Sequence, residues 1–405
     1  MTEKSAKPQL RFAGFDDTWE QRELGSITSS YSGGTPTAGK AEYYDGDIPF
    51  IRSGEINEEK TELFLSELGY KNSSAAMVEK GDILYALYGA TSGEVSISKL
   101  KGAINQAILA IKPNEGYDSE FLMQWLRNQK DNIISTYLQG GQGNLSGTIV
   151  KSLKVDITTY DEQQAIGAYF RNLDNLITLH QRKYDKLTNV KKSMLEKMFP
   201  KNGSNVPEIR FKGFSDAWEQ RKLSEVADKV TEKNARLQYI ETFTNSAEFG
   251  IISQRDFFEH DVAKLSSLDG YYIVENDDFV YNPRISTSAP VGPINRNKLG
   301  RTGVMSPLYT VFRTHDINHT YLEYFFKCGY WHSFMNFNGD SGARSDRFSI
   351  KDYVFFQMPI PIPHIEEQRK IGDFMVYLDR LITLHQRELE KLKNLKKACL
   401  EKMFV

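Results

Sequence analysis

Two long segments of the chain carry apolar residues at alternating spacings of three and four, the period of an amphipathic helix. They run over residues 161–199 and 366–404, and each starts at a polar residue that suits a helix cap, Asp161 and Glu366. So narrow a stripe is typical of a coiled-coil seam. Each predicted helix has about 39 residues and is roughly 58 Å long. The predicted seam positions are Leu173, Leu176, His180, Tyr184, Leu187, Val190, Met194 and Met198, and Leu378, Leu381, His385, Leu389, Leu392, Leu395, Cys399 and Met403.

The two helical segments are near copies of each other. Residues 173–199 and 378–404 share 19 identities in 27 positions, including the heptapeptide LITLHQR and the ending LEKMF. A second pair of matching stretches lies upstream, RFAGFDDTWEQREL at 11–24 and RFKGFSDAWEQRKL at 210–223. The chain is therefore an internal duplication of two tandem halves.

The sequence between these matching ends differs between the halves. GDILYALYGATSGEV at 81–95 stands where the second half has DDFVYNPRISTSAPV at 277–291. The positions that agree include Asp82 and Asp278, Tyr85 and Tyr281, and Thr91 and Thr287. Alternating apolar residues, aromatics, and Gly, Pro, Ser and Asn punctuation predict short strands and loops in both middles.

Together these patterns predict an α/β (α+β) fold of two pseudo-two-fold halves. We expect a mixed-sheet domain at 1–160, a long helix at 161–200, a second mixed-sheet domain at 201–365 and a second long helix at 366–405. The helices are expected to bury their stripes against each other as an antiparallel coiled coil, and a two-fold scaffold favours a two-fold target such as duplex DNA. The residues expected to pair are Leu173, Leu176, His180, Leu187, Leu378, Leu381, His385 and Leu392.

The composition of the chain indicates its cellular compartment and limits the class of partner. The 405 residues are 40% hydrophobic and 26% charged, as in ordinary globular proteins. There is no apolar signal region and no run of about 18 apolar residues, and the only cysteines are Cys328 and Cys399, so we expect a cytoplasmic protein. A net charge of −2 argues against a stand-alone nonspecific nucleic-acid binder, although it allows local basic patches.

Motifs for catalysis and for cofactor binding are missing from the sequence. It contains no G-x-x-x-x-G-K-[ST] loop for ATP and no G-x-G-x-x-G. The nearest approach to the Asn-Pro-Pro-aromatic signature of adenine methyltransferases is NPR at 282–284, which lacks the second proline. These absences indicate a non-catalytic chain.

Two groups of residues have the types needed for a metal site. Asp47 with EEK at 58–60 offers the carboxylates and lysine of a metal nuclease, but a solvated acidic turn after a strand is the favoured interpretation. His315 and His319 are four residues apart, but no cysteine or carboxylate cluster completes a ligand set. A surface loop is favoured there too, and we expect no metal.

Four motifs follow one another along the chain. A W-E-x-x-x-L start is followed by SGGTPTAGKAEYYDGDIPFIRSGEI at 32–56, a GD-I-L-x-x-x-x-G-x-T-S-G stretch and an E-Q-x-x-I-G helix. This order resembles the specificity (S) subunit of type I restriction-modification enzymes. The resemblance covers almost the whole chain, because both halves have the W-E start, the GD or DD strand and the E-Q helix; the second half has no close counterpart of SGGTP or IPFIRSGEI.

The resemblance implies a function as well as a fold. In that family each variable domain reads a different half of a bipartite, gapped DNA site, so divergence between the halves is expected. The paired helices are then expected to set the spacing and to dock two methyltransferase (M) subunits, which two restriction (R) subunits join in a complete system. This chain is expected to bind no cofactor, because S-adenosylmethionine, ATP and Mg would lie on the partner subunits.

Candidate DNA-reading residues lie in basic and Gly-rich stretches of the variable domains. Residues 281–313 carry a local charge of +5 with no acid, which suits phosphate contact, although an ordinary basic face is the alternative. Amide and guanidinium side chains on Gly-rich loops at 140–144 and 339–347 suit base edges. The predicted DNA-binding residues are Arg52, Tyr85, Tyr88, Thr91, Ser92, Gln142 and Asn144 in the first half, and Arg284, Thr287, Arg296, Lys298, Arg301, Arg344 and Arg347 in the second.

Two other classes of function stay open on the sequence alone. A stand-alone DNA-modifying enzyme would need the missing cofactor motifs, and a helical scaffold that never touches DNA would use the duplicated helices only as a core. His180 and His385 are expected to be packing residues rather than a pH switch. Measuring methyl transfer and DNA-library binding with and without a methyltransferase partner discriminates among these functions.

Overall fold

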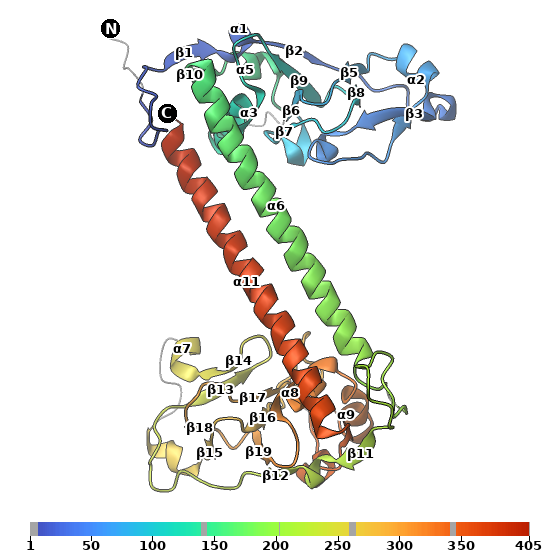
Figure 1. Ribbon diagram of the computed structural model, residues 1–405, viewed down its shortest axis with the longest axis vertical. Coiled ribbons are helices and arrows are strands. Elements are labelled where there is room, and N and C mark those ends of the chain that lie inside the picture. The colour runs from blue at the N-terminus through green and yellow to red at the C-terminus, as the bar shows by residue number, and fades with distance from the viewer. Residues whose placement is uncertain (1–6, 139–143, 202, 259–264, 341–345, 405) are drawn as a thin grey trace. The chain divides into compact units, whose positions relative to one another are not determined.

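The computed structural model describes residues 7–138, 144–201, 203–258, 265–340 and 346–404 (Figure 1). The chain divides into two compact units: unit 1 is Met1–Arg182 with Gln386–Val405, and unit 2 is Lys183–His385. Helix α6 (Tyr160–Lys197) begins in unit 1 and ends in unit 2, and helix α11 (Ile365–Met403) takes the opposite course. Each unit thus contains one variable domain and parts of both long helices.

Unit 1 is built on two four-stranded sheets. Its strands are β1 (Glu20–Glu23), β2 (Thr28–Ser32), β3 (Tyr44–Ile51), β4 (Phe64–Leu65), β5 (Ala76–Val78), β6 (Ile83–Ala86), β7 (Val95–Ile97), β8 (Gly102–Ile104), β9 (Ile108–Pro113) and β10 (Lys154–Ile157). The sheet β2-β9-β6-β7 is antiparallel, whereas β4-β3-β8-β5 contains a parallel pair, β3 with β8. Strands β1 and β10, which come first and last in the sequence of the domain, pair with each other.

Short helices connect and cover these strands. They are α1 (Leu24–Ile27), α2 (Glu67–Lys71), α3 (Ser119–Asn128), α4 (Lys130–Tyr137) and α5 (Gly147–Lys151), with 3-10 turns η1 (Ala41–Tyr43), η2 (Ser53–Glu55) and η3 (Gly89–Thr91). Helix α3 starts at Asp118, whose carboxylate accepts the Phe121 amide at 2.9 Å. Its apolar face is buried in the core of unit 1.

Unit 2 repeats part of this plan. Its strands are β11 (Glu219–Lys222), β12 (Ala227–Lys229), β13 (Phe243–Ser246), β14 (Gly250–Ser253), β15 (Tyr272–Val274), β16 (Phe279–Tyr281), β17 (Ile294–Arg296), β18 (Gly303–Met305), β19 (Thr310–Thr314) and β20 (Pro359–Ile362). The sheet β12-β19-β16-β17 has the same strand order as β2-β9-β6-β7, and the pairs β15-β18 and β11-β20 match β5-β8 and β1-β10. A hairpin of β13 and β14 stands where unit 1 has β3 and β4.

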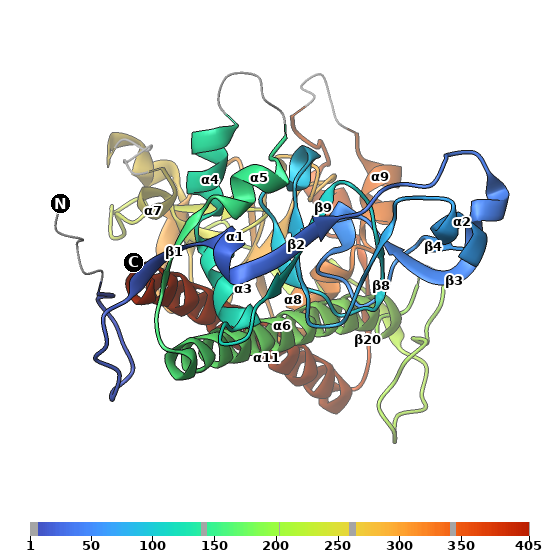
Figure 2. The same ribbon diagram turned by 90° about the horizontal axis from the view of Figure 1, so that it is seen from above.

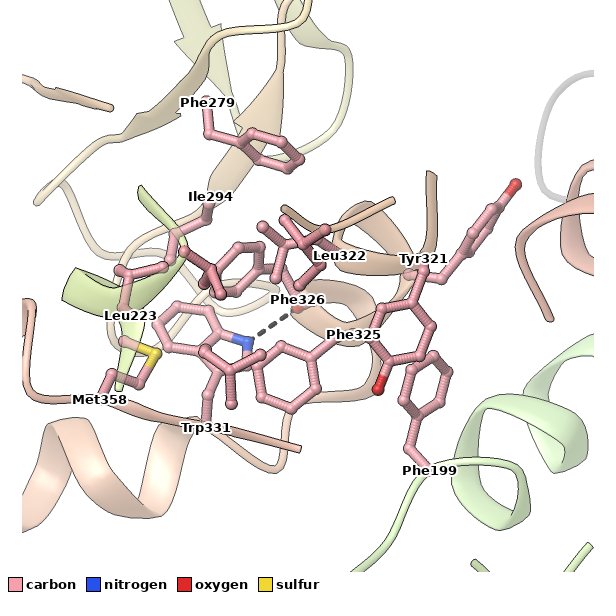
Figure 3. Close-up of a cluster of buried hydrophobic side chains, with 14 of the residues drawn as sticks. Phe199, Leu223, Phe279, Ile294, Tyr321, Leu322, Phe325, Phe326, Trp331 and Met358 are labelled. Atoms are coloured by element: carbon pink, nitrogen blue, oxygen red, sulfur yellow. Dashed lines mark hydrogen bonds between the residues drawn. The ribbon is translucent and has the colours of Figure 1, made fainter. Parts of the chain in front are cut away.

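The helices of unit 2 surround an aromatic core. They are α7 (Gln254–Phe258), α8 (His319–Cys328), α9 (His332–Asn338) and α10 (Asp352–Phe355), with turns η4 (Leu223–Glu225) and η5 (Leu265–Gly270). Figure 3 shows how the rings of Phe325, Phe326 and Trp331 pack together, with the Trp331 indole N–H donating to the Phe326 carbonyl at 2.8 Å. Rings this closely packed are a large apolar contribution to the stability of the unit.

Asp82 and Asp278, which agree between the halves, occupy the same structural position. Each carboxylate accepts a backbone amide from the turn before the central strand, at 2.8 Å in unit 1 and 2.7 Å in unit 2. Each also binds a cation on the neighbouring strand: Lys112 is 3.2 Å from Asp82, and Arg313 is 2.8 Å from Asp278. The shared aspartate therefore stabilises a turn and has a structural role rather than a ligand-binding one.

The two long helices pack in an antiparallel sense within each unit. In unit 1 the Tyr169 hydroxyl lies 3.5 Å from Cys399 Sγ, and Lys396 donates to Asp174 at 2.6 Å. In unit 2 Lys191 donates to Asp379. The predicted α/β fold with paired long helices is confirmed. Among the described residues no helix is long and apolar enough to span a membrane.

The helix contacts follow most of the predicted seam. Leu173 and Leu378 are buried in the cores of their units, Leu187 and Leu392 pack against these cores, and His180, Leu381 and His385 are half-buried. Leu395, however, is 43% exposed, and so is Leu176. Its neighbour Ile177 is half-buried and lines a cleft with Lys396 and Leu400 of α11. Ile177 rather than Leu176 therefore occupies this seam position, because a three-four repeat fits either of two adjacent apolar residues.

The shared ending LEKMF inserts a phenylalanine into the variable domain at the far end of each helix. Phe199, after α6, contacts Tyr321 and Phe325 in unit 2 at centroid distances of 5.5 and 6.2 Å. Phe404, after α11, contacts Phe121 and Phe170 in unit 1 at 5.3 and 5.8 Å. Each long helix is thus anchored at its C-terminal end in the core of the unit that it enters.

The E-Q pair at the start of each long helix fastens that helix to its own domain. Glu162 is fully buried and accepts two hydrogen bonds from Arg11, at 2.6 and 2.7 Å; Glu367 accepts two from Arg210, at 2.7 and 2.8 Å. The adjacent Gln163 accepts the backbone amide of Asp118, just before α3, at 3.0 Å. In the same way Gln368 accepts the backbone amide of Asn318, just before α8, at 2.8 Å. We call the Arg11–Glu162 and Arg210–Glu367 pairs the two latches.

Candidate nucleic-acid interface

In unit 1 the chain turns sharply after β6 and meets the segment that precedes α5. The turn passes through Gly89, whose φ of +72° lies in the left-handed region that favours glycine. Tyr88 and Asn144 form an isolated antiparallel bridge, and a backbone hydrogen bond of 2.9 Å joins the two segments beside it. We call residues 87–92 with residues 144–145 corner 1.

Corner 1 contains four of the predicted DNA-binding residues, and three of them reach the surface. Tyr88 is 36% exposed, Asn144 is exposed, and Thr91 is half-buried with its hydroxyl donating to the Tyr88 carbonyl at 3.3 Å. Phenol, hydroxyl and amide groups hydrogen-bond to phosphates and base edges. Helices α4 and α5, which flank this region, lie on the side of unit 1 away from α6 (Figure 2).

Unit 2 repeats this construction after β16. Arg284 and Arg347 form an isolated antiparallel bridge at the position of the bridge in corner 1, again beside a backbone hydrogen bond between the two segments, here of 2.7 Å. We call residues 283–288 with residues 346–348 corner 2. The same backbone junction therefore presents a tyrosine and an asparagine in one unit and two arginines in the other.

The arginines of corner 2 are available for an external anion. Arg284 is exposed and Arg347 half-buried, and neither forms an ion pair within the described ranges of the chain. Thr287 is exposed beside them. Two neighbouring guanidinium groups suit phosphate oxygens or the O6 and N7 acceptors of guanine.

Two other cations of the basic stretch are bound within the protein. The Arg296 guanidinium and the Lys298 ammonium each lie 2.8 Å from the carboxylate of Glu323, which is buried on α8. Burial alone would raise the pKa of Glu323, but Lys327 and Lys298 outweigh it and lower that pKa to about 2. These cations neutralise a buried charge, so we remove Arg296 and Lys298 from the proposed interface.

Arg301 and Arg313 have internal partners as well. Arg301 donates two hydrogen bonds of 2.8 Å to Glu241, which lowers the pKa of that carboxyl, and Arg313 makes two bonds to Asp278 at 2.8 and 2.9 Å. Most of the local charge of +5 is therefore compensated by acids from elsewhere in the chain. We withdraw Arg301 too, so that Arg284 is the one cation of this stretch that stays in the interface.

Three predicted residues of unit 1 have structural roles instead. Tyr85 is completely buried in β6, where burial raises its pKa to about 12. Ser92 is buried and donates to a backbone carbonyl at 3.1 Å. Arg52 is bound to Glu55 and Glu62, each at 2.6 Å. These side chains belong to the core or to a surface ion-pair cluster, and we leave them out of the interface.

Two further predictions cannot be placed, because Gln142 and Arg344 lie outside the described residues. Both loops that carry them rejoin the described chain at a corner, through Asn144 and Arg347. Their assignment as DNA-binding residues stays a prediction.

A cleft beside corner 2 was missed by the sequence reasoning. It has a volume of about 590 Å³, and Arg284 of corner 2 lines it together with Gln254, Phe257 and Tyr309. The adjacent phenylalanines at 257 and 258, flanked by polar residues, were the only local signal for an exposed aromatic surface.

The candidate metal residues do not form a cluster. His315 lies near Asp316 and Asp228, at 3.0 and 3.7 Å, and His319 lies 3.9 Å from Asp277. Over the described residues, no group of three or more His, Cys, Asp or Glu side chains is placed to hold a metal ion.

The duplicated geometry coincides with a known domain family. Residues 16–189 and 215–394 each match the type I restriction modification DNA specificity domain. The two matches span most of the chain and contain both corners, both E-Q helix starts and most of both long helices. The chain therefore belongs to the family of type I restriction modification DNA specificity domains.

Full-length relatives carry the same arrangement. The chain is 22% identical over 401 residues to the type I restriction enzyme MjaVIII specificity subunit of Methanocaldococcus jannaschii, covering 94% of this chain and 91% of the relative. A putative MjaX specificity subunit of the same organism is 24% identical over 414 residues, with the same coverage. The crystal structure of a type I restriction-modification S subunit from M. genitalium shares the fold, with a TM-score of 0.57, 14% identity and 99% of each chain covered.

Proposed function

We propose that this chain is the sequence-reading subunit of a type I restriction-modification complex. Corner 1 and its surroundings read one half of a bipartite DNA site, and corner 2 and its surroundings read the other half. The observation that carries this proposal is the repeated backbone junction with different exposed side chains, Tyr88 and Asn144 against Arg284 and Arg347. Equal frameworks with unequal contact groups suit two half-sites of different sequence.

The long helices serve as the spacer and as the docking surface for two methyltransferase subunits. Exposed leucines lie at equivalent positions of the two copies, Leu179 on α6 and Leu384 on α11. Apolar side chains on the surface of a helix offer contacts to a protein partner. One such surface in each unit supports two docked methyltransferases rather than one.

The chemistry belongs to those partners. Adenine methylation needs S-adenosylmethionine, and restriction needs ATP and Mg, so these ligands would be held by the methyltransferase and by two restriction subunits. This chain contributes double-stranded DNA recognition and the geometry of the assembly. It needs no cofactor of its own for that role.

A domain exchange tests this function. Residues 227–361 would be replaced by the equivalent segment of another specificity subunit, and the chimera would be assembled with the methyltransferase. We expect the methylated sequence to change in one half of the site and to stay the same in the other, because the replaced segment contains corner 2 but not corner 1. Sequencing of methylated genomic DNA reads out both halves at once.

The parent chain with and without the methyltransferase provides the control. Methylation should require both proteins, and a DNA library bound by the complex should be enriched in a gapped site. A change in both halves of the site after the exchange, or methyl transfer by this chain alone, would contradict the proposal.

A further inference from the structure

The cleft beside corner 2 lies between two parts of unit 2 that are far apart in sequence. One wall comes from the β13-β14 hairpin and α7, and the other from the 282–288 and 306–309 segments. Its volume of about 590 Å³ is within the range of small-molecule sites. Nothing in the proposed reading by corner 2 uses this space.

Gln254, which lines the cleft, carries a buried acceptor without a partner. Gln254 is only 8% exposed, and its amide nitrogen donates to the Phe243 carbonyl at 3.3 Å. Its Oε1 accepts no hydrogen bond from any described residue. A buried polar atom of this kind costs free energy unless a donor reaches it, so the site favours a ligand that brings an N–H group.

The other amides around the cleft are already satisfied. Asn245 donates to the Val280 carbonyl at 2.7 Å and accepts from Asn295 at 2.7 Å, and Asn282 donates to the Asn245 carbonyl at 2.8 Å. These asparagines hold the two walls together. Gln254 is therefore distinguished from its neighbours by its open acceptor.

The mouth of the cleft is aromatic and exposed. Phe257 and Phe258 meet edge to face at 4.7 Å, Phe249 lies 6.3 Å from Phe257, and Leu308 stands on the opposite wall. Phe249 is 60% exposed and Leu308 is 59% exposed. Such a cluster at a cleft suits a flat, partly apolar ligand, and every nucleobase offers a π-face for stacking.

The charged side chains at the mouth indicate which parts of a nucleotide would lie there. Arg284 lines the cleft and belongs to corner 2, so a phosphate bound there would place its own nucleoside at the opening. Glu248 is the one acid among the described lining residues, and it suits a base amino group rather than a phosphate. The cleft and corner 2 thus form one continuous surface.

We propose that this cleft holds one base of the second half-site, turned out of the DNA stack, with an N–H of that base donating to Gln254 Oε1 and its ring against Phe257. This inference rests on the proposed function, since it needs corner 2 to bind DNA. A base that stays stacked offers its edge only in a groove, where it meets exposed side chains, so reaching the buried Gln254 requires extrusion. Adenine, cytosine and guanine fit best, because thymine flanks its single N–H with two carbonyls that would oppose the acceptor.

An analogue scan of the second half-site tests the hydrogen bond in the assembled complex. One base at a time is replaced by its form without the exocyclic amino group: purine for adenine, inosine for guanine, and 2-pyrimidinone for cytosine. At one position we expect the affinity of the parent to fall about tenfold or more, and that of Gln254→Leu to be insensitive to the same replacement. The matched control is Gln220→Leu, an exposed glutamine in β11 of the same unit, which should behave as the parent does.

Gln254→Glu keeps an acceptor of the same shape but loses the donor to the Phe243 carbonyl. In a complex that melts as the parent does, it should keep the sensitivity of the parent. Loss of sensitivity in both Gln254 variants would mean that cavity damage explains the effect, and would overturn the proposal. So would the absence of any position whose sensitivity depends on Gln254. Thermal melting, together with methylation of the first half-site, shows whether each variant complex is folded and still reads DNA.

Extrusion and stacking have their own test. A mismatch that keeps the bound base but weakens its pairing should tighten binding by the parent, since less pairing is lost on extrusion. Phe257→Ala should remove this gain, and Phe257→Tyr should retain it. If Phe257→Ala instead weakens methyltransferase binding and leaves all DNA responses unchanged, the cleft is a protein interface and the base pocket is wrong. Either result leaves bipartite recognition intact, so it is distinguishable from a failure of the proposed function.

Discussion

The two units share the contacts of their framework but differ in the side chains that they expose to solvent. The latches Arg11–Glu162 and Arg210–Glu367, the E-Q helix starts and the inserted phenylalanines form the same contacts twice. The corners keep their backbone bridge and change their side chains, and the hairpin β13-β14 replaces β3 and β4. A duplicated chain can thus preserve the framework of two domains while their binding groups diverge.

Breaking either latch is expected to cause the largest loss of stability. Arg11→Ala or Arg210→Ala would leave a fully buried glutamate without its guanidinium, which costs about 3–5 kcal/mol. If the frameworks are equivalent, the two substitutions should lower the free energy of unfolding of their own units by similar amounts. Denaturant unfolding followed by hydrogen exchange in each unit measures both losses.

An exposed ion pair is the control for the latches. Arg22 lies 2.6 Å from Glu20, with both side chains more than half exposed, so Arg22→Ala should change the unfolding free energy by less than about 1 kcal/mol. Markedly unequal losses at Arg11 and Arg210 would show that the two latches are alike in geometry only.

A smaller effect tests how closely the helix starts match. Gly167 and Gly372 are equivalent, but a methyl group at Gly167 would lie 2.5 Å from the Asp118 carboxylate, whereas at Gly372 its nearest neighbour would be the Thr320 methyl at 3.1 Å. We expect Gly167→Ala to destabilise unit 1 by about 1–2 kcal/mol, since crowding exceeds the gain in helix propensity. Gly372→Ala should be close to neutral in thermal melts of the same protein, and equal losses would contradict the difference in packing.

The smallest effect separates corner 2 from the rest of the basic stretch. Arg284→Ala should weaken DNA binding by the complex and reduce the slope of log affinity against log salt by about one. Arg301→Ala is the matched control, because Arg301 is bound to Glu241 and should leave this slope unchanged. Titrations at several salt concentrations measure both, and equal slopes for the two variants would remove Arg284 from the interface.

The framework was predictable from the sequence because its signals are local or duplicated. The helices predicted at 161–199 and 366–404 begin one residue earlier, at Tyr160 and Ile365. Their predicted seam fails at two positions that are each 43% exposed, Leu395 and Leu176, and Ile177 takes the place of Leu176 because packing decides between two adjacent apolar residues.

The interface was less predictable because its residues depend on distant partners. The charge of 281–313 looked free, but Glu241 and Glu323 reach it from outside that stretch. Tyr85 matched a binding pattern by sequence, yet β6 is a central strand buried on both faces, so no alternation marks an exposed side. Such long-range pairings leave no trace in local composition.

In the proposed function the duplicated helices fix the gap between the half-sites, and changing the length of both helices tests this role most directly. One heptad would be inserted after Tyr184 and another after Leu389, close to the boundaries between the units, which keeps the seam nearly in phase. Each helix gains about 10.5 Å, or roughly three base pairs at about 3.4 Å each.

The measurement is methylation across DNAs with constant half-sites and a gap that varies by single base pairs. We predict an optimum about three base pairs longer than that of the parent. Binding at the new optimum should be weaker than the parent's at its own, because three pairs turn the duplex by roughly 100° and a heptad turns the helix face by about 20°. A folded variant that keeps the parental optimum would show that the helices are only a core and that the spacing is set elsewhere.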